Sequence, residues 1–106
     1  MRYGIMKKCT VDEIVIALCA DYARRKRAIA EHTTSHRTEM EYRYLNYRIY
    51  DGTSEIVGCE LAEQYIEEIG SRAGYAKSRA EVSECAYKDQ KRLAKQSIAR
   101  KLHLID

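Results

Sequence analysis

Residues 10–31 of this chain read TVDEIVIALCADYARRKRAIAE. Apolar residues recur in this stretch at steps of three and four, which is the spacing of one face of an α-helix. Thr10 and Glu13 have the spacing of a capping box, which satisfies backbone N–H groups at a helix start. The bases Arg24, Arg25 and Arg27 gather near the far end, where positive charge favours the helix dipole. We predict one helix from about residue 11 to about residue 31.

A second helix is predicted after the polar HTTS segment that follows. Thr34 or Ser35 can cap its first turn, because a short hydroxyl side chain accepts a hydrogen bond from a free N–H there. The apolar period then continues across Gly52 to Val57. Gly58 is expected to end the helix, since glycine adopts the backbone angles that helix ends often need.

Two further helices are predicted, over 60–72 and over 75–102. The first carries many acids, and the second has a thin, alanine-rich apolar face that suits close helix–helix contact. No stretch alternates apolar and polar residues as a strand does. We expect an all-α fold, a compact bundle of three to four helices in a single domain, 1–106, with a long C-terminal helix. Since that thin face buries little within one chain, we expect it to pair with a second copy in a homo-oligomer.

Charge is distributed unevenly along the 106 residues. Lys and Arg total 19 and Asp and Glu total 16, for a net charge of +3. Residues 59–75 carry a net charge of −3, whereas residues 76–106 carry +4. Basic ends that flank an acidic middle permit an anionic partner or head-to-tail contacts between copies.

Enzyme, metal and membrane classes find little support. His32 and His36 are four residues apart, but no third metal ligand is implied nearby. There is neither a GxGxxG nor a GxxxxGK[ST] phosphate loop. No apolar run is long enough to span a membrane. The cysteines lack CxxC spacing, so we expect reduced thiols, with Cys19 as a small core residue. We therefore expect a cytoplasmic, non-enzymatic protein with no metal, no cofactor and no membrane contact.

Residues 66–82 read IEEIGSRAGYAKSRAEV. Ile69, Gly70, Ala73 and Gly74 follow one another as an apolar, a small, an apolar and a turn residue. The segment resembles the helix-turn-helix of sigma-factor region 4 and of related small phage transcription regulators. The alternative is a plain helical hairpin with a glycine-bearing turn.

The resemblance implies a second helix that presents polar and basic side chains to the major groove of DNA. The basic run near residue 25 adds candidates for contacts to phosphate. The candidate nucleic-acid-binding residues are Lys77, Ser78, Arg79, Lys88, Arg24, Arg25 and Arg27.

A second candidate surface is the stretch where tyrosine and arginine alternate, near residue 45. Aromatic rings stack on nucleobases and guanidinium groups bind phosphates, so this helix is a candidate nucleotide or single-strand site. Its candidate residues are Tyr42, Arg43, Tyr47 and Arg48.

The leading functional hypothesis is a small non-enzymatic DNA-binding regulator of the phage type. The alternative is a phage anti-defence inhibitor that sequesters a nucleotide signal or blocks a host nuclease complex. The second alternative is a helical assembly protein. The expected partners are accordingly a nucleic acid or nucleotide, a second copy, or a host protein complex.

Overall fold

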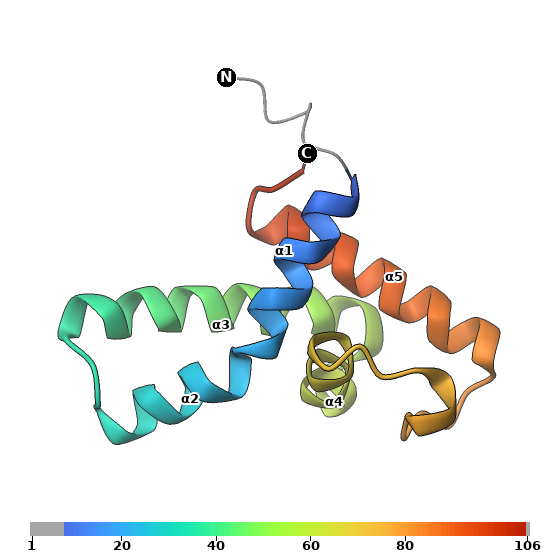
Figure 1. Cartoon of the computed structure of the whole chain (residues 1–106), viewed down its shortest axis with the longest axis horizontal. Coiled ribbons are helices and arrows are strands. Elements are labelled where there is room, and N and C mark those ends of the chain that lie inside the picture. Colours follow the sequence, from blue (N-terminus) through green and yellow to red (C-terminus); the bar gives the residue numbers. More distant parts are fainter. Residues whose placement is uncertain (1–7, 106) are drawn as a thin grey trace.

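The structure, a computed structural model, describes residues 8–105 of the chain and the side chains of residues 10–105. Its elements, in chain order, are α1 (Lys8–Ala20), α2 (Tyr22–Glu31), α3 (His36–Val57), α4 (Cys59–Gly70), the short 3-10 helix η2 (Tyr75–Lys77) and α5 (Glu84–Lys101) (Figure 1). No strand occurs among the described residues. The predicted all-α fold, a compact bundle with a long C-terminal helix, is confirmed.

The helix predicted over 11–31 is interrupted by a sharp corner at Asp21, so that prediction is wrong in its middle. The Arg25 guanidinium donates to the carbonyl of Leu18, and the Asn46 amide donates to the carbonyl of Tyr22 at 3.1 Å. These side chains satisfy two backbone carbonyls near the break, one on each side of Asp21. The predicted capping box at Thr10 is also wrong, because α1 already includes Lys8 and so contains Thr10.

The second predicted helix agrees with α3. The Ser35 hydroxyl accepts a hydrogen bond from the Thr38 N–H at 3.2 Å and caps the first turn. Gly58 has a φ of +87° and ends the helix, as expected for a residue without a side chain. Gly52 lies buried inside α3, where a Cβ atom would come within 2.9 Å of the backbone of Ile98. That close approach lets α3 and α5 pack tightly.

The C-terminal helix begins nine residues later than predicted. Residues 78–83 leave the helical conformation, and α5 starts after Ser83, whose hydroxyl accepts from the Ala86 N–H at 3.2 Å. The alanine-rich face does not protrude toward a second copy, which corrects that prediction. Ala94 and Ile98 are fully buried within the chain, and Gly52 leaves room for Ile98 against α3.

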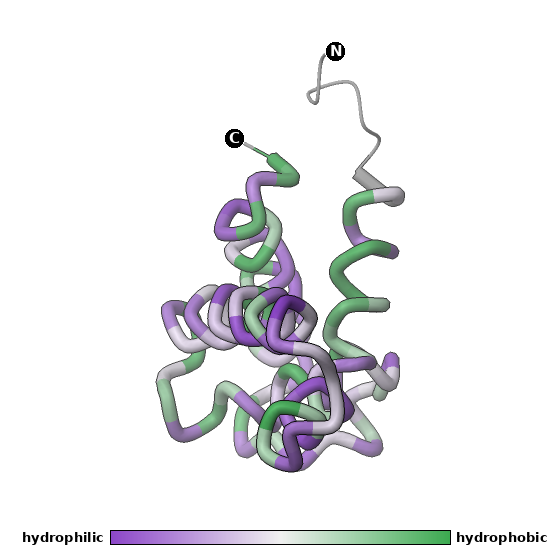
Figure 2. The backbone as a smooth tube through the Cα atoms, turned by 90° about the vertical axis from the view of Figure 1, so that its left-hand side faces the viewer, coloured by the Kyte–Doolittle hydropathy of each residue, from purple (hydrophilic) through white to green (hydrophobic). Residues whose placement is uncertain are grey.

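Helices α1, α4, α5 and the C-terminal half of α3 form the body of the molecule. Their shared core contains Val11, Val15, Cys19, Ile49, Ile66, Ile69, Ala94, Ile98 and Ala99. Figure 2 shows α1 as the most continuously hydrophobic helix. Helix α2 and the N-terminal half of α3 run side by side and extend away from the body as a two-helix arm (Figure 1). None of the described helices is both long and apolar enough to cross a membrane.

Cys19 is predicted to be unreactive in the folded protein. It is buried, and burial raises the pKa of its thiol to about 12 because a thiolate there would lose its hydration. Cys59 and Cys85 are exposed. We expect iodoacetamide at pH 8 to alkylate Cys59 and Cys85 in the native protein and Cys19 only after denaturation, as measured by peptide mass spectrometry. Native labelling of Cys19 at the rate of Cys85 contradicts its place in the core.

Candidate nucleic-acid interface

The N-terminal half of α5 has one buried face and one polar, exposed face. Tyr87 and Ala94 point inward and are at most 1 % exposed. The outward face spans about three turns and carries no large apolar side chain. Its exposed residues are Glu84, Cys85, Lys88, Asp89 and Arg92. A helix that is anchored on one side and polar on the other can enter a groove of nucleic acid without unpacking.

The segment before α5 is held in place by a buried carboxylate on α4. Glu68 is 4 % exposed and accepts hydrogen bonds from the Tyr87 hydroxyl at 2.9 Å and from the Arg79 backbone N–H at 3.2 Å. The Tyr75 hydroxyl donates to the carbonyl of Val82 at 2.8 Å. A buried carboxylate with hydrogen-bond donors on both sides fixes its neighbours strongly. The segment 75–83 is therefore fastened to α4 through Arg79, and the Tyr75 hydroxyl bonds back to the end of the same segment.

Tyr87 is the centre of this attachment. Its ring lies 5.7 Å from the rings of both Tyr65 and Tyr75, and Lys91 lies 5.1 Å above it. Burial, and then the hydrogen bond to Glu68, raise the pKa of the Tyr87 hydroxyl to about 12. The hydroxyl therefore keeps its proton, and donates to Glu68, throughout the neutral and moderately alkaline range.

The second helix required by the helix-turn-helix resemblance does not form between residues 75 and 82. Lys77 ends the short helix η2, and Ser78 and Arg79 follow in non-helical backbone. The physical reason is that the Arg79 N–H bonds to the Glu68 carboxylate rather than to a preceding carbonyl. The expectation that these residues lie on a recognition helix is thus wrong. Lys77 and Arg79 are nevertheless exposed, and Lys88 is exposed on α5.

The basic run on α2 does not join this surface. Arg25 is 3 % exposed and donates to Asn46 at 2.7 Å, so its assignment as a phosphate contact is wrong. Arg24 is exposed and pairs with Asp21 at 3.4 Å, and Arg27 is exposed. Figure 1 places α2 and the start of α5 at opposite ends of the long axis of the molecule. The two basic regions are therefore separate surfaces.

The tyrosine–arginine segment on α3 is only partly assembled as predicted. Arg43 and Tyr47 do line one groove of about 420 Å³ between α2 and α3, together with Tyr22, Lys26, Ile29, Asn46 and Tyr50. Tyr42 and Arg48 are not among the lining residues. The Tyr42 ring lies under Arg24 at 5.8 Å, and Arg48 lies over the Tyr44 ring at 5.1 Å.

The polar groups of this groove already have partners within the chain. Arg43 donates to the Glu39 carboxylate at 3.1 Å, and Lys26 pairs with Glu63 at 2.5 Å. Those carboxylates would repel an anion placed between them. Bases are paired with acids at the start of α5 as well, where Lys88 lies 2.8 Å from Glu84. What distinguishes that region is Lys77, which has no ion-pair partner among the described residues.

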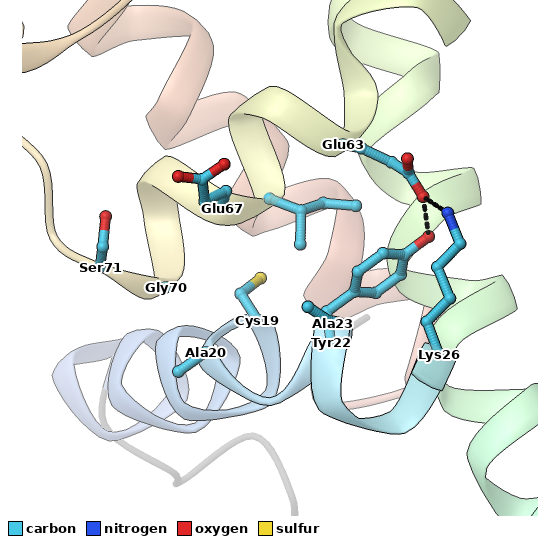
Figure 3. A pocket seen from close by; sticks show the side chains of 10 residues that line it. Cys19, Ala20, Tyr22, Ala23, Lys26, Glu63, Glu67, Gly70 and Ser71 are labelled. Atoms are coloured by element: carbon cyan, nitrogen blue, oxygen red, sulfur yellow. Dashed lines mark hydrogen bonds and ion pairs between the residues drawn. The ribbon is translucent and has the colours of Figure 1, made fainter. Parts of the chain in front are cut away.

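A second cavity, of about 440 Å³, lies between the corner at Asp21 and α4 (Figure 3). Cys19, Ala20, Ala23, Ile66 and Gly70 form its apolar part. At one end Tyr22 donates to Glu63 at 3.0 Å and Lys26 pairs with the same carboxylate. Lys26 holds the pKa of Glu63 below its usual value, while burial, with the hydrogen bond to Glu63, raises that of Tyr22. Tyr22, Lys26 and Glu63 therefore already have hydrogen-bond and ion-pair partners in one another.

Sequence reasoning missed three residues that organise the candidate interface: Glu68, Tyr87 and Arg92. A usable signal was present, because Ser83 is a favoured N-cap residue and Glu84 puts an acid in the first turn of the helix that follows. That signal places the start of the last helix at residue 84. No group of three or more metal-ligating side chains occurs in the described part of the chain. Comparisons with protein-family models, curated proteins and solved structures find no match to this chain.

Proposed function

We propose that this protein is a small non-enzymatic DNA-binding regulator that contacts duplex DNA through the start of α5 and the segment that precedes it. The observation that carries the proposal is the attachment of this basic segment to α4 and α5. Glu68 bonds both to the Arg79 backbone N–H and to Tyr87 of α5, while the Arg79 side chain pairs with Glu67 of α4 at 3.3 Å. The helix that the helix-turn-helix resemblance requires over residues 75–82 does not form, so the proposal rests on the exposed, basic surface and not on that resemblance.

The exposed face of α5 offers both donors and acceptors to base edges. Lys88 and Arg92 donate, while Glu84 and Asp89 accept, and side chains of these types discriminate bases in the major groove. Within the chain Lys88 pairs with Glu84 at 2.8 Å and Arg92 with Asp89. All four side chains are more than half exposed, so solvent screens each pair and it exchanges readily for a contact with DNA.

Charge supports binding to an anionic polymer at this end of the molecule. Residues 71–95 contain seven Lys or Arg and three Asp or Glu, and Glu67 and Glu68 of α4 add two acids beside Arg79. Lys77 has no ion-pair partner among the described residues, which leaves its ammonium group available to phosphate. Phosphate contacts of this kind position a protein on the duplex and make its affinity depend on salt. A regulator of this kind acts in the cytoplasm, in contact with the DNA, and needs no cofactor.

The test is fluorescence anisotropy with a labelled duplex of mixed sequence, titrated at low and at physiological salt. We expect the double variant Lys77→Ala/Lys88→Ala to weaken binding about tenfold or more at low salt. It should also lower the slope of log affinity against log salt by about two, because each lost phosphate contact removes roughly one.

Two matched charge removals on the arm, Arg27→Ala and Arg43→Ala, are the controls. Both residues are exposed, and they belong to α2 and to the N-terminal half of α3, which lie away from the start of α5 (Figure 1). Binding that survives these changes but not the α5 changes supports the proposal. The proposal is overturned if the wild type leaves the duplex unbound at low salt. It is also overturned if the arm variants lose as much affinity as the α5 variants, which assigns the interface to α2 and α3.

A further inference from the structure

Three large apolar side chains lie exposed along one face of α3. Met40 is 53 % exposed, Tyr44 46 % and Tyr47 64 %. Steps of four and three place them on one side of the helix. That face lies on the arm, away from the core of α1, α4 and α5 (Figure 1). A patch of exposed apolar side chains with charged neighbours is typical of a surface that binds another protein.

The charges beside this patch lack strong partners within the chain. The Nε atom of Arg48 is buried without a hydrogen-bond partner, and Arg48 forms no ion pair among the described residues. Its guanidinium lies over the Tyr44 ring at 5.1 Å. Glu41 pairs only with Arg37, at 3.6 Å, and the Arg37 side chain is 93 % exposed. The Glu41 carboxylate is thus paired only with an exposed base, and the Arg48 guanidinium has no acid partner among the described residues.

We propose that this face of α3 binds the same face of a second copy, with the two helices antiparallel about a two-fold axis near Tyr44. In such a pair, a residue three or four positions before the axis lies near a residue three or four positions after it. Glu41 then faces Arg48 of the partner subunit, and Met40 faces Tyr47 of the partner subunit. The two-fold axis forms each contact twice, so the dimer contains two Glu41–Arg48 ion pairs.

Helical geometry places the members of each pair on the same edge of the face. At 100° per residue, Glu41 and Arg48 both lie clockwise of Tyr44, whereas Met40 and Tyr47 both lie on the other side. The two-fold axis of an antiparallel pair places each edge of one helix face against the same edge of the partner's face. Glu41 and Arg48 therefore meet along one edge, and the apolar side chains of Met40 and Tyr47 meet along the other. This match of the face with itself is the reason for choosing a second copy as the occupant.

The proposed dimer interface is separate from the proposed DNA-binding surface. The start of α5 lies at the other end of the long axis, so it stays accessible when α3 pairs (Figure 1). The dimer is therefore tested independently of DNA.

The test is sedimentation analysis of charge reversals over a range of protein concentrations. We expect the wild type to dimerise reversibly. Glu41→Arg and Arg48→Glu should each weaken the dimer at least about tenfold, since each places two like-charged pairs in the interface. A 1:1 mixture of these two variants should form a dimer again, because every pair in the mixed dimer is of opposite sign. Arg27→Glu, an exposed reversal on α2, is the matched control and should dimerise as the wild type does.

Several results overturn the proposal. One is a wild type that stays monomeric at every concentration. Another is a dimer that persists in both single variants, which places the interface elsewhere. A third is a mixture that stays monomeric while both variants keep native circular dichroism, which excludes the antiparallel register. If a charge-reversal variant loses its helical circular dichroism, sedimentation of Tyr44→Ser takes its place as the test. A Tyr44→Ser dimer as strong as that of the wild type overturns the proposal.

Discussion

Replacing Gly70 by alanine is expected to lower the free energy of unfolding by about 2–3 kcal/mol. Gly70 is the last residue of α4, where that helix crosses the end of α1. A Cβ atom at this position would lie 2.6 Å from the nitrogen of Ala20 and 2.8 Å from the carbonyl carbon of Cys19. Both neighbours are backbone atoms, which cannot move aside as a flexible side chain can. The helices must therefore separate, which opens the core around Cys19.

The measurement is urea denaturation followed by circular dichroism, with Gly74→Ala as the matched control. Gly74 has a φ of −85°, and no atom lies within 4 Å of an added Cβ. Its replacement should leave stability unchanged or raise it slightly. Gly52→Ala should fall between the two, because its clash with Ile98 is partly offset by the better helix propensity of alanine. Equal urea midpoints for the Gly70→Ala and Gly74→Ala variants contradict the close crossing of α4 and α1 at Gly70.

Replacing Arg25 by alanine is expected to cost about 3–4 kcal/mol, the other large effect. The guanidinium is buried and donates to the Asn46 side chain at 2.7 Å and to the carbonyl of Leu18. Alanine leaves both acceptors buried without this donor and opens a cavity at the corner between α1 and α2. Burial lowers the pKa of this guanidinium, yet arginine remains charged at any physiological pH, so its hydrogen bonds do not depend on pH there.

Arg24→Ala is the matched control, since Arg24 is the adjacent base and is more than half exposed. We expect its stability to lie within about 0.5 kcal/mol of the wild type. A double-mutant cycle with Asn46→Ala measures the coupling directly, and a coupling of about 1 kcal/mol or more is expected for a buried, charged hydrogen bond. If the changes in unfolding free energy of Arg25→Ala and Asn46→Ala are additive, the two side chains act separately, and the stabilising role of the hydrogen bond between them is refuted.

Helix boundaries were predictable where a local cap specifies them. Ser35 and Gly58 bracket α3 as expected, because the side chain at the start and the backbone freedom at the end act within one turn. The corner at Asp21 was not predictable, since the apolar period runs through it unchanged. It depends on Arg25 and on Asn46, a residue 24 positions from the Tyr22 carbonyl that it binds.

The candidate interface was predicted in residue type but not in form. Lys77, Arg79 and Lys88 are exposed bases, as the sequence suggested. The expected helix through residues 77–79 is absent, because a carboxylate on α4 captures the Arg79 N–H. For the basic run at Arg24–Arg27, the helix was predicted correctly but the exposure of its side chains was not. Four adjacent bases look alike in a sequence, yet Arg25 is buried while Arg24 and Arg27 face solvent.

By itself the sequence determined that the chain is helical, where α3 begins and ends, and that Cys19 belongs to the core. These features depend on the three- and four-residue spacing of apolar side chains and on caps, which act over one or two turns. Only the tertiary structure decided the corner at Asp21, the extended segment before α5 and the roles of Gly52 and Gly70. Each of those depends on an atom that lies far away along the chain and is close only once the helices have packed.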